Sequence, residues 1–380
     1  MGEFRRIKAA LIGSGAISEK YLTNITQKFH VIDMVGCSDL IPERSAHRAE
    51  QFGIRQMTNE EILSDPTIEI VINTTYPLSH YEVTKAALLA GKHVYTEKML
   101  AVTLEEGIEL CELAKEKGLQ LTTAPDTFLG GGWQTARHMI DTGLIGTPIG
   151  ALGVCIRSYQ DHGDTYREPK SFIFGGGGGI PFDMGGYYLH NMINLLGGIR
   201  RVTGFIQTRN ETRTYTNPRH PKFGQEWKVD SPNVMFGTLE FCSGALGSLI
   251  VTSESSMFDT PKFEVYGTEG TIRLFDPNDY SGKITLQRNV DPEPVEMPLL
   301  FPYNDENRGI GVADMAYAML NGRKPRDSYE IGLQAFEAVH GIWKSGQEGI
   351  VYEMKSTCER PAAVPLTALN GSAYETQLND

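Results

Sequence analysis

The sequence predicts an α/β protein of two domains, with a parallel sheet in residues 1–125 and a larger, mostly antiparallel open sheet with helices in residues 126–380. Three observations lead to this prediction. The 380 residues exceed the usual size of one domain. Short apolar runs alternate with helical patterns up to Pro125, as in repeated β-α-β units. After Pro125, long segments are rich in β-branched and aromatic residues, which favour strands.

The first part reads as alternating strands and helices. We expect strands at Ile7–Ile12, Val31–Ser38, Ile68–Asn73, His93–Thr96 and Leu119–Thr123. We expect helices at Ile17–Lys28, Ser45–Phe52, Ser79–Ala90 and Thr103–Glu116. Ser79 and Thr103 are suited to cap the last two helices, and Gly91 and Gly118 to end them.

The second part combines strands with a few helices. We expect strands at Ile149–Tyr159, Arg201–Arg209, Val234–Phe241, Ala245–Ser253, Phe263–Tyr266, Thr271–Phe275 and Lys283–Arg288. Helices are expected at Trp133–Thr142, Met184–Leu196, Glu306–Leu320 and Tyr329–Lys344. We expect the last three to pack on the large sheet.

Composition and charge exclude several classes of partner. Lys and Arg number 35 against 47 Asp and Glu, and the net charge of −12 opposes attraction to nucleic acid or anionic membranes. The sequence shows neither a signal peptide nor an apolar run of the roughly 18 residues that a membrane span needs. Five scattered cysteines indicate a reducing cytoplasm. His162, Asp164, Asp183 and His190 lack a compact ligand spacing, so no metal is expected.

A glycine motif directly follows the first strand. Gly13 permits a tight turn, Gly15 lets a pyrophosphate approach the backbone, and Ala16 and Ile17 lead into a helix whose N-terminus attracts anions. Ser18 replaces the third glycine of the dinucleotide fingerprint. The motif therefore predicts a dinucleotide site, and the alternative is a tight turn without a ligand.

An acidic residue ends the second strand. Asp39 stands where a carboxylate binds the ribose hydroxyls of NAD and would repel the 2′-phosphate of NADP. NAD is therefore favoured over NADP, although Arg44 lies close in the sequence. The alternative is a solvated Asp39 that caps the next helix.

Four motifs, in order along the chain, resemble the Gfo/Idh/MocA oxidoreductases: GSGAIS, TTYPLSHYEVTKAALLAGKHVYTEK, IDTGLIGTPIGA and GGGGGIPFDMGGYYLHNMINLLGG. The resemblance implies an N-terminal Rossmann domain and a C-terminal α/β domain whose open sheet forms homodimer or homotetramer contacts. It places the active site in the cleft between the two domains.

The chain departs from the family pattern at three positions. Met99 stands where the family has the proline of Glu-Lys-Pro, while Lys98 is retained. The family signature Asp-x-Gly-x-His ends here in Tyr187, as in a branch that acts on sugars and diols. His190 falls where many relatives have aspartate.

Hydride transfer from a carbinol needs a group that takes the hydroxyl proton. We expect Lys98 to be this group, with its pKa lowered by burial beside a cationic nicotinamide. Asp183 and Tyr187, four residues apart on a helix, would reach vicinal hydroxyls from the same face. We expect Asp183 to bind hydroxyls and stabilise the lysine charge, and Tyr187 to orient the substrate or relay the proton. The alternatives are a surface Lys98, a helix-capping Asp183 and a Tyr187 that only packs in the core.

Further positions support this site. The run Gly175–Gly179 is expected to pass close to substrate or nicotinamide, the alternative being a flexible linker. By comparison with the family, expected cofactor contacts are Thr74, Thr75, His80, Glu97, Lys98 and Asp126. Expected substrate contacts are Lys98, Arg157, Tyr159, His162, Asp183, Tyr187 and His190.

The resulting expectation is an NAD-dependent oxidoreductase that acts on a secondary hydroxyl of a cyclic sugar, inositol or glycoside, or on the matching ketone. Two alternatives remain open. One is a glycoside-cleaving member of the family, in which tightly bound NAD oxidises the ring transiently. The other is a non-catalytic NAD-binding regulator.

Overall fold

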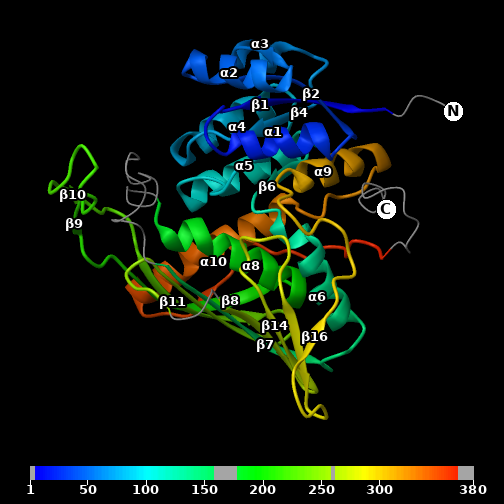
Figure 1. Cartoon of the computed structure of the whole chain (residues 1–380), viewed down its shortest axis with the longest axis vertical. Coiled ribbons are helices and arrows are strands. Elements are labelled where there is room, and N and C mark those ends of the chain that lie inside the picture. Colours follow the sequence, from blue (N-terminus) through cyan, green and yellow to red (C-terminus); the bar gives the residue numbers. More distant parts are fainter. Residues whose placement is uncertain (1–4, 158–177, 258–261, 367–380) are drawn as a thin grey trace.

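The computed structural model describes residues 5–157, 178–257 and 262–366, which form two large sheets with helices. Figure 1 shows the first sheet and its helices, in blue and cyan, at one end of the molecule, and the second sheet, in green and yellow, at the other. The chain is thus an α/β protein with a Rossmann sheet and a mostly antiparallel sheet, as predicted.

The first sheet is parallel, with strand order β3-β2-β1-β4-β5-β6. Its strands are β1 Ile7–Ile12, β2 Ile32–Ser38, β3 Arg55–Gln56, β4 Ile70–Asn73, β5 His93–Thr96 and β6 Leu121–Thr123. The central strands β1 and β4 read as near-continuous apolar runs because helices cover both faces of a parallel sheet. The short edge strand β3 was not predicted.

Helices α1 Ser18–Gln27, α2 Pro42–Phe52, α3 Asn59–Ser64, α4 His80–Leu89 and α5 Leu104–Glu116 connect these strands. The predicted cap of α5 is confirmed, because the Thr103 hydroxyl accepts a hydrogen bond from the Glu106 N–H at 3.2 Å. Gly91 and Gly118 follow α4 and α5 with φ of 78° and 63°, so the predicted helix ends are confirmed too. Helix α3 was not predicted.

The second sheet has the strand order β16-β15-β14-β13-β7-β12-β11-β8-β17. Its strands are β7 Pro148–Ile156, β8 Ile199–Gln207, β11 Val234–Phe241, β12 Leu246–Thr252, β13 Lys262–Gly267, β14 Gly270–Leu274, β15 Ile284–Arg288, β16 Val295–Met297 and β17 Tyr352–Glu353. Strands β7 and β12 are parallel, and every other neighbouring pair is antiparallel. A separate hairpin joins β9 Thr212–Thr214 to β10 Glu226–Lys228.

Helices α6 Gly131–Asp141, α8 Ile180–Leu196 and α10 Tyr329–Glu348 belong to the second part. Helix α8 packs on β7, β11 and β12, and α10 packs on β8 and against α8. Two single-turn helices, η1 Pro77–Ser79 and η2 Thr127–Leu129, follow β4 and β6. None of the helices in the described ranges is long and apolar enough to cross a membrane.

Helix α9, Ile310–Asn321, corrects one prediction, because it packs on the parallel sheet and not on the large one. Its residues share a hydrophobic core with β1, α1 and β5, and Figure 1 shows it in gold beside β6. Gly311 allows this close approach, since a Cβ there would lie 2.7 Å from Cε2 of Tyr95. The apolar pattern predicts that the helix is buried, but it does not indicate which of the two sheets the helix packs on.

Candidate active site

Three predicted catalytic residues meet between the two sheets. Lys98 follows β5 at the carboxyl edge of the parallel sheet, while Asp183 and Tyr187 lie on successive turns of α8. The Lys98 ammonium forms an ion pair with Asp183 Oδ1, and its Nζ lies 5.3 Å from the centre of the Tyr187 ring. The Lys98 side chain is 19% exposed and that of Asp183 is 8% exposed. Residues from both parts of the chain thus form one largely buried charge cluster.

The structure places Asp183 and Tyr187 inside the helix, on one face. Gly179, with φ of 118°, is the N-cap of α8, and Pro181 is in its first turn. Asp183 is therefore not the helix cap that was weighed as an alternative; its carboxylate binds Lys98 instead. Tyr187 is buried, but its hydroxyl lies within 3.5 Å of the Arg308 guanidinium. This contact gives the tyrosine a polar partner beyond core packing.

The Lys98 ammonium is stabilised by Asp183, the role that was expected of this carboxylate. Burial acts to lower the pKa of Lys98, but attraction to Asp183, Tyr187 and Glu97 outweighs it and raises the pKa above its ordinary value. In the protein without NAD, Lys98 is therefore an ammonium at neutral pH. The lowered pKa expected beside a bound cationic nicotinamide stays a prediction.

The Glu97 carboxylate contacts both the Lys98 backbone and helix α1. Its Oε1 accepts a hydrogen bond from the Tyr21 hydroxyl at 2.7 Å, and its Oε2 accepts one from the Lys98 N–H at 3.0 Å. Tyr21 also lies 3.2 Å from the Tyr95 hydroxyl. Glu97 therefore ties the lysine loop to α1, and its expected contact with a cofactor stays a prediction.

The predicted phosphate loop has the shape that a dinucleotide needs. Gly13 has φ of 104°, and a Cβ there would lie 2.5 Å from the Thr75 nitrogen, so only glycine fits between β1 and β4. Within the described residues, a Cβ on Gly15 would meet nothing within 4 Å. Ala16 and Ile17 complete the turn, and α1 presents its N-terminus there. These features fit the pyrophosphate of NAD.

The two threonines after β4 brace this loop. The Thr74 hydroxyl donates to the Gly13 carbonyl at 2.7 Å, and the Thr75 hydroxyl donates to Asn73 Oδ1 at 2.7 Å. Both lie beside the glycine turn. Their contact with a cofactor stays a prediction.

Asp39 lies at the end of β2, where Oδ1 accepts a hydrogen bond from the Ile41 N–H at 2.8 Å. The next residue, Leu40, is apolar and 89% exposed. A carboxylate beside an exposed apolar side chain suits a ribose and a flat aromatic base.

His80 and Asp126 are buried and engaged by the protein. His80 Nδ1 lies 2.6 Å from the Met99 carbonyl oxygen, and Nε2 lies 3.1 Å from that of Thr75. Burial lowers the pKa of His80, although the contacts with the two carbonyl oxygens act to raise it. Asp126 Oδ1 accepts a hydrogen bond from the Tyr280 hydroxyl at 2.5 Å. Both residues brace the site, and direct contact with a cofactor stays a prediction for each.

The other residues expected to contact the substrate differ in their surroundings. Arg157, at the end of β7, pairs with Asp276. His190 is buried on α8, where its Nδ1 lies 2.8 Å from the Gly186 carbonyl oxygen, and burial lowers its pKa to about 4. Tyr159 and His162 lie outside the described residues, as does most of the run Gly175–Gly179. Among the described residues, no three His, Cys, Asp or Glu side chains are placed to hold a metal.

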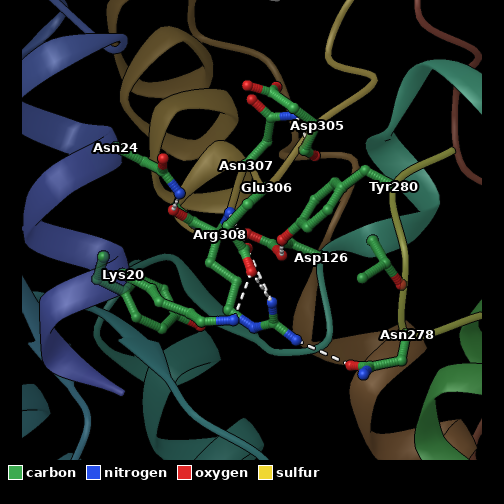
Figure 2. Close-up of polar contacts among 12 residues, drawn as sticks. Lys20, Asn24, Asp126, Asn278, Tyr280, Asp305, Glu306, Asn307 and Arg308 are labelled. Carbon is green, nitrogen blue, oxygen red and sulfur yellow. Dashed lines mark hydrogen bonds and ion pairs between the residues drawn. The ribbon is translucent and has the colours of Figure 1, made fainter. Parts of the chain in front are cut away.

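Sequence reasoning missed Arg308, whose guanidinium approaches the Tyr187 hydroxyl, and the residues that hold it. Figure 2 shows Glu306 and Asn278 in contact with Arg308. Arg308 donates to Asn278 Oδ1 at 2.8 Å and approaches Tyr187. Glu306 in turn binds the Arg308 guanidinium through both carboxylate oxygens. Arg308 and Glu306 lie more than a hundred positions from Tyr187 and Asn278 lies about ninety, in segments with no recognised motif. No local pattern could have found them.

Comparison with known proteins agrees with this geometry. A family model described as "Oxidoreductase family, NAD-binding Rossmann fold" matches residues 7–124, and the model of the GFO/IDH/MocA C-terminal domain matches residues 133–273. The chain is 28% identical to 1,5-anhydro-D-fructose reductase of Ensifer adhaerens over 76% of this chain and 82% of that protein.

Two further proteins are similar. D-xylose dehydrogenase of Paenarthrobacter nicotinovorans is 24% identical over 65% of this chain, a match that spans 64% of the relative. A solved structure of levoglucosan dehydrogenase with NADH superposes with a TM-score of 0.79, at 21% identity, over 93% of this chain and 100% of that chain, which shows a shared fold. The chain therefore belongs to the GFO/IDH/MocA family and is an NAD-binding oxidoreductase.

Proposed function

We propose that this enzyme transfers a hydride between NAD and a secondary hydroxyl, or the matching ketone, of a cyclic sugar, inositol or glycoside. The observation that carries the proposal is the Lys98 ammonium held by Asp183 beside Tyr187 at the carboxyl edge of the parallel sheet. In open α/β sheets this edge is where ligands bind. The activities of two sequence relatives, a xylose dehydrogenase and an anhydrofructose reductase, support the substrate class.

Each of the three residues has a role that its geometry allows. Bound NAD supplies the hydride acceptor or donor. Asp183 and the Tyr187 hydroxyl bind vicinal hydroxyls, because a carboxylate accepts and a phenol both donates and accepts. Lys98 exchanges the proton of the reacting oxygen, donating it during reduction and accepting it during oxidation.

The raised pKa of Lys98 makes the two directions unequal. In reduction, the ammonium is already present to protonate the carbonyl oxygen as the hydride arrives. In oxidation, Lys98 must first lose a proton before it can accept that of the hydroxyl. Oxidation is therefore expected to accelerate as the pH rises, whereas reduction needs no such step.

The experiment that tests this proposal is a screen of cyclic sugars, inositols and glycosides with NAD and with NADP. It follows nicotinamide absorbance and released products together. Formation of NADH with a ketone product supports the proposal. Released sugar without net NADH indicates glycoside cleavage, and NAD binding without turnover of any compound indicates a regulator; either result contradicts it.

We also propose that the enzyme is a cytoplasmic homodimer or homotetramer that associates through the face of the large sheet opposite α8 and α10. Phe205 and Phe236 are cross-strand partners and are 65% and 52% exposed. Leu246, on the neighbouring strand β12, lies on the same face and is 56% exposed. Exposed apolar side chains on one sheet indicate an interface. The free thiols of the five cysteines agree with a reducing compartment.

A further inference from the structure

A short segment before α9 crosses the cofactor helix α1. We call residues 305–309 the strap (Figure 2). Lys28 Nζ lies 2.8 Å from Asp305 Oδ2, and Lys20 Nζ lies 2.7 Å from Glu306 Oε2. These pairs join the strap to the helix whose N-terminus faces the predicted phosphate site.

Arg308 extends from the strap toward the catalytic residues. Asn24 of α1 donates to the Arg308 carbonyl oxygen at 3.0 Å and so fixes its backbone. Its Nη1 lies 2.8 Å and 2.6 Å from the two carboxylate oxygens of Glu306. Its Nη2 donates to Asn278 Oδ1 at 2.8 Å and to the Tyr187 hydroxyl at 3.5 Å. The guanidinium, on a residue that is 9% exposed, is thus fixed on three sides.

The far end of the strap is anchored as well. Asp126 Oδ2 accepts hydrogen bonds from the Gly309 and Gly311 N–H groups, each at 3.0 Å. Gly309 has φ of 103°, which favours glycine where the strap turns into α9. Because both ends are held, Arg308 has little freedom to leave Tyr187.

Two cations therefore face the Tyr187 side chain. Lys98 lies over its ring and Arg308 contacts its hydroxyl. Burial raises the pKa of Tyr187, while Lys98 and Arg308 act against that rise. A phenol between two cations presents its oxygen as an acceptor, since neither neighbour can accept its proton.

We propose that Arg308 is a positioning residue, which fixes the Tyr187 hydroxyl in the orientation that binds the substrate beside Lys98. The inference rests on the proposed function, because Tyr187 is placed there as a substrate-binding residue. It adds a residue that no motif indicates and explains why the strap is fastened so firmly to α1. The strap thus fixes the Arg308 guanidinium, which in turn orients the Tyr187 hydroxyl.

The test compares Arg308→Gln and Arg308→Lys with a matched control, Arg5→Gln. Arg5 precedes β1 at the amino edge of the parallel sheet, opposite the site, and its side chain is 66% exposed and pairs with Glu69. We expect Arg308→Gln to lower kcat about tenfold or more, the loss that follows from removing a hydrogen bond to a charged group. Arg308→Lys should recover part of this loss, and Arg5→Gln should match the wild type. The NAD dissociation constant should stay the same in all variants.

A second measurement does not depend on turnover. Tyrosine labelled with 13C at Cζ reports the ionisation of Tyr187 by NMR, with the signal assigned through Tyr187→Phe. We expect Arg308→Gln to move this titration to higher pH, because the cation that favours the phenolate is lost. An unchanged Tyr187 titration in a folded Arg308→Gln protein would overturn the inference, as would an unchanged kcat. An enzyme inactive on every compound, but with the shifted titration, would contradict only the proposed function.

Discussion

The ion pair between Lys98 and Asp183 allows the most specific prediction about the site. Lys98→Met removes the ammonium but keeps an unbranched apolar chain of similar length. Asp183 then loses this counter-ion in a place where its side chain is 8% exposed. Breaking a buried pair by removing one partner costs about 3–5 kcal/mol. We therefore expect Lys98→Met to be clearly less stable than the wild type.

The double variant Lys98→Met, Asp183→Asn removes both charges. It should regain about 2 kcal/mol or more relative to the sum of the two single changes, because no buried charge is left without its partner. Urea unfolding of the four proteins, each without NAD, measures this coupling. Additive losses from the two single variants would refute a buried, interacting pair.

The pH dependence of stability provides an independent test of the same ion pair. In the wild type, the pKa of Lys98 is raised on folding, so its contribution is fully present below the unfolded value and is lost as the pH rises through the folded value. In Lys98→Met the pKa of the buried Asp183 should be raised instead. That variant should therefore regain stability relative to the wild type as the pH falls, and a constant difference across acidic pH would contradict this account.

Two further predictions concern the cofactor site. Gly13→Ala should destabilise the protein by about 1–3 kcal/mol and weaken NAD binding, because its Cβ would lie 2.5 Å from the Thr75 nitrogen at φ of 104°. Thermal unfolding measures the stability and calorimetry the NAD affinity, and wild-type values for both would contradict the prediction. Asp39→Ser should lower the affinity for NAD about tenfold because the carboxylate that binds the ribose is lost, so the ratio of NADP affinity to NAD affinity should rise. Fluorescence titration measures both affinities, and the same ratio in variant and wild type would argue against this role.

The sequence was most informative where structure is local. Periodicity and glycine spacing identified the parallel sheet, the turn at Gly13 and the cap at Thr103, because each depends on residues a few positions apart. The pairing of Asp183 with Tyr187 on one helix face was predicted for the same reason. The short strand β3 was missed because Arg55 and Gln56 are both exposed and polar.

The rest depended on contacts between distant segments. Helix α9 was assigned to the wrong sheet because its apolar surface fits either one. Arg308 was missed because its contact with Tyr187 joins segments far apart in the sequence. The raised pKa of Lys98 in the protein without NAD has a related cause: it depends on how closely Asp183 approaches the ammonium, and the sequence does not give this distance.

The central claim is that Lys98 exchanges the proton of the reacting oxygen. The most direct test measures kcat and the NAD dissociation constant of Lys98→Met on a compound that the wild-type enzyme oxidises. We expect kcat to fall by about 10²–10⁴, the usual contribution of a general acid or base, while NAD still binds with nearly wild-type affinity. A Lys98→Met enzyme that turns over at the wild-type rate would contradict the account.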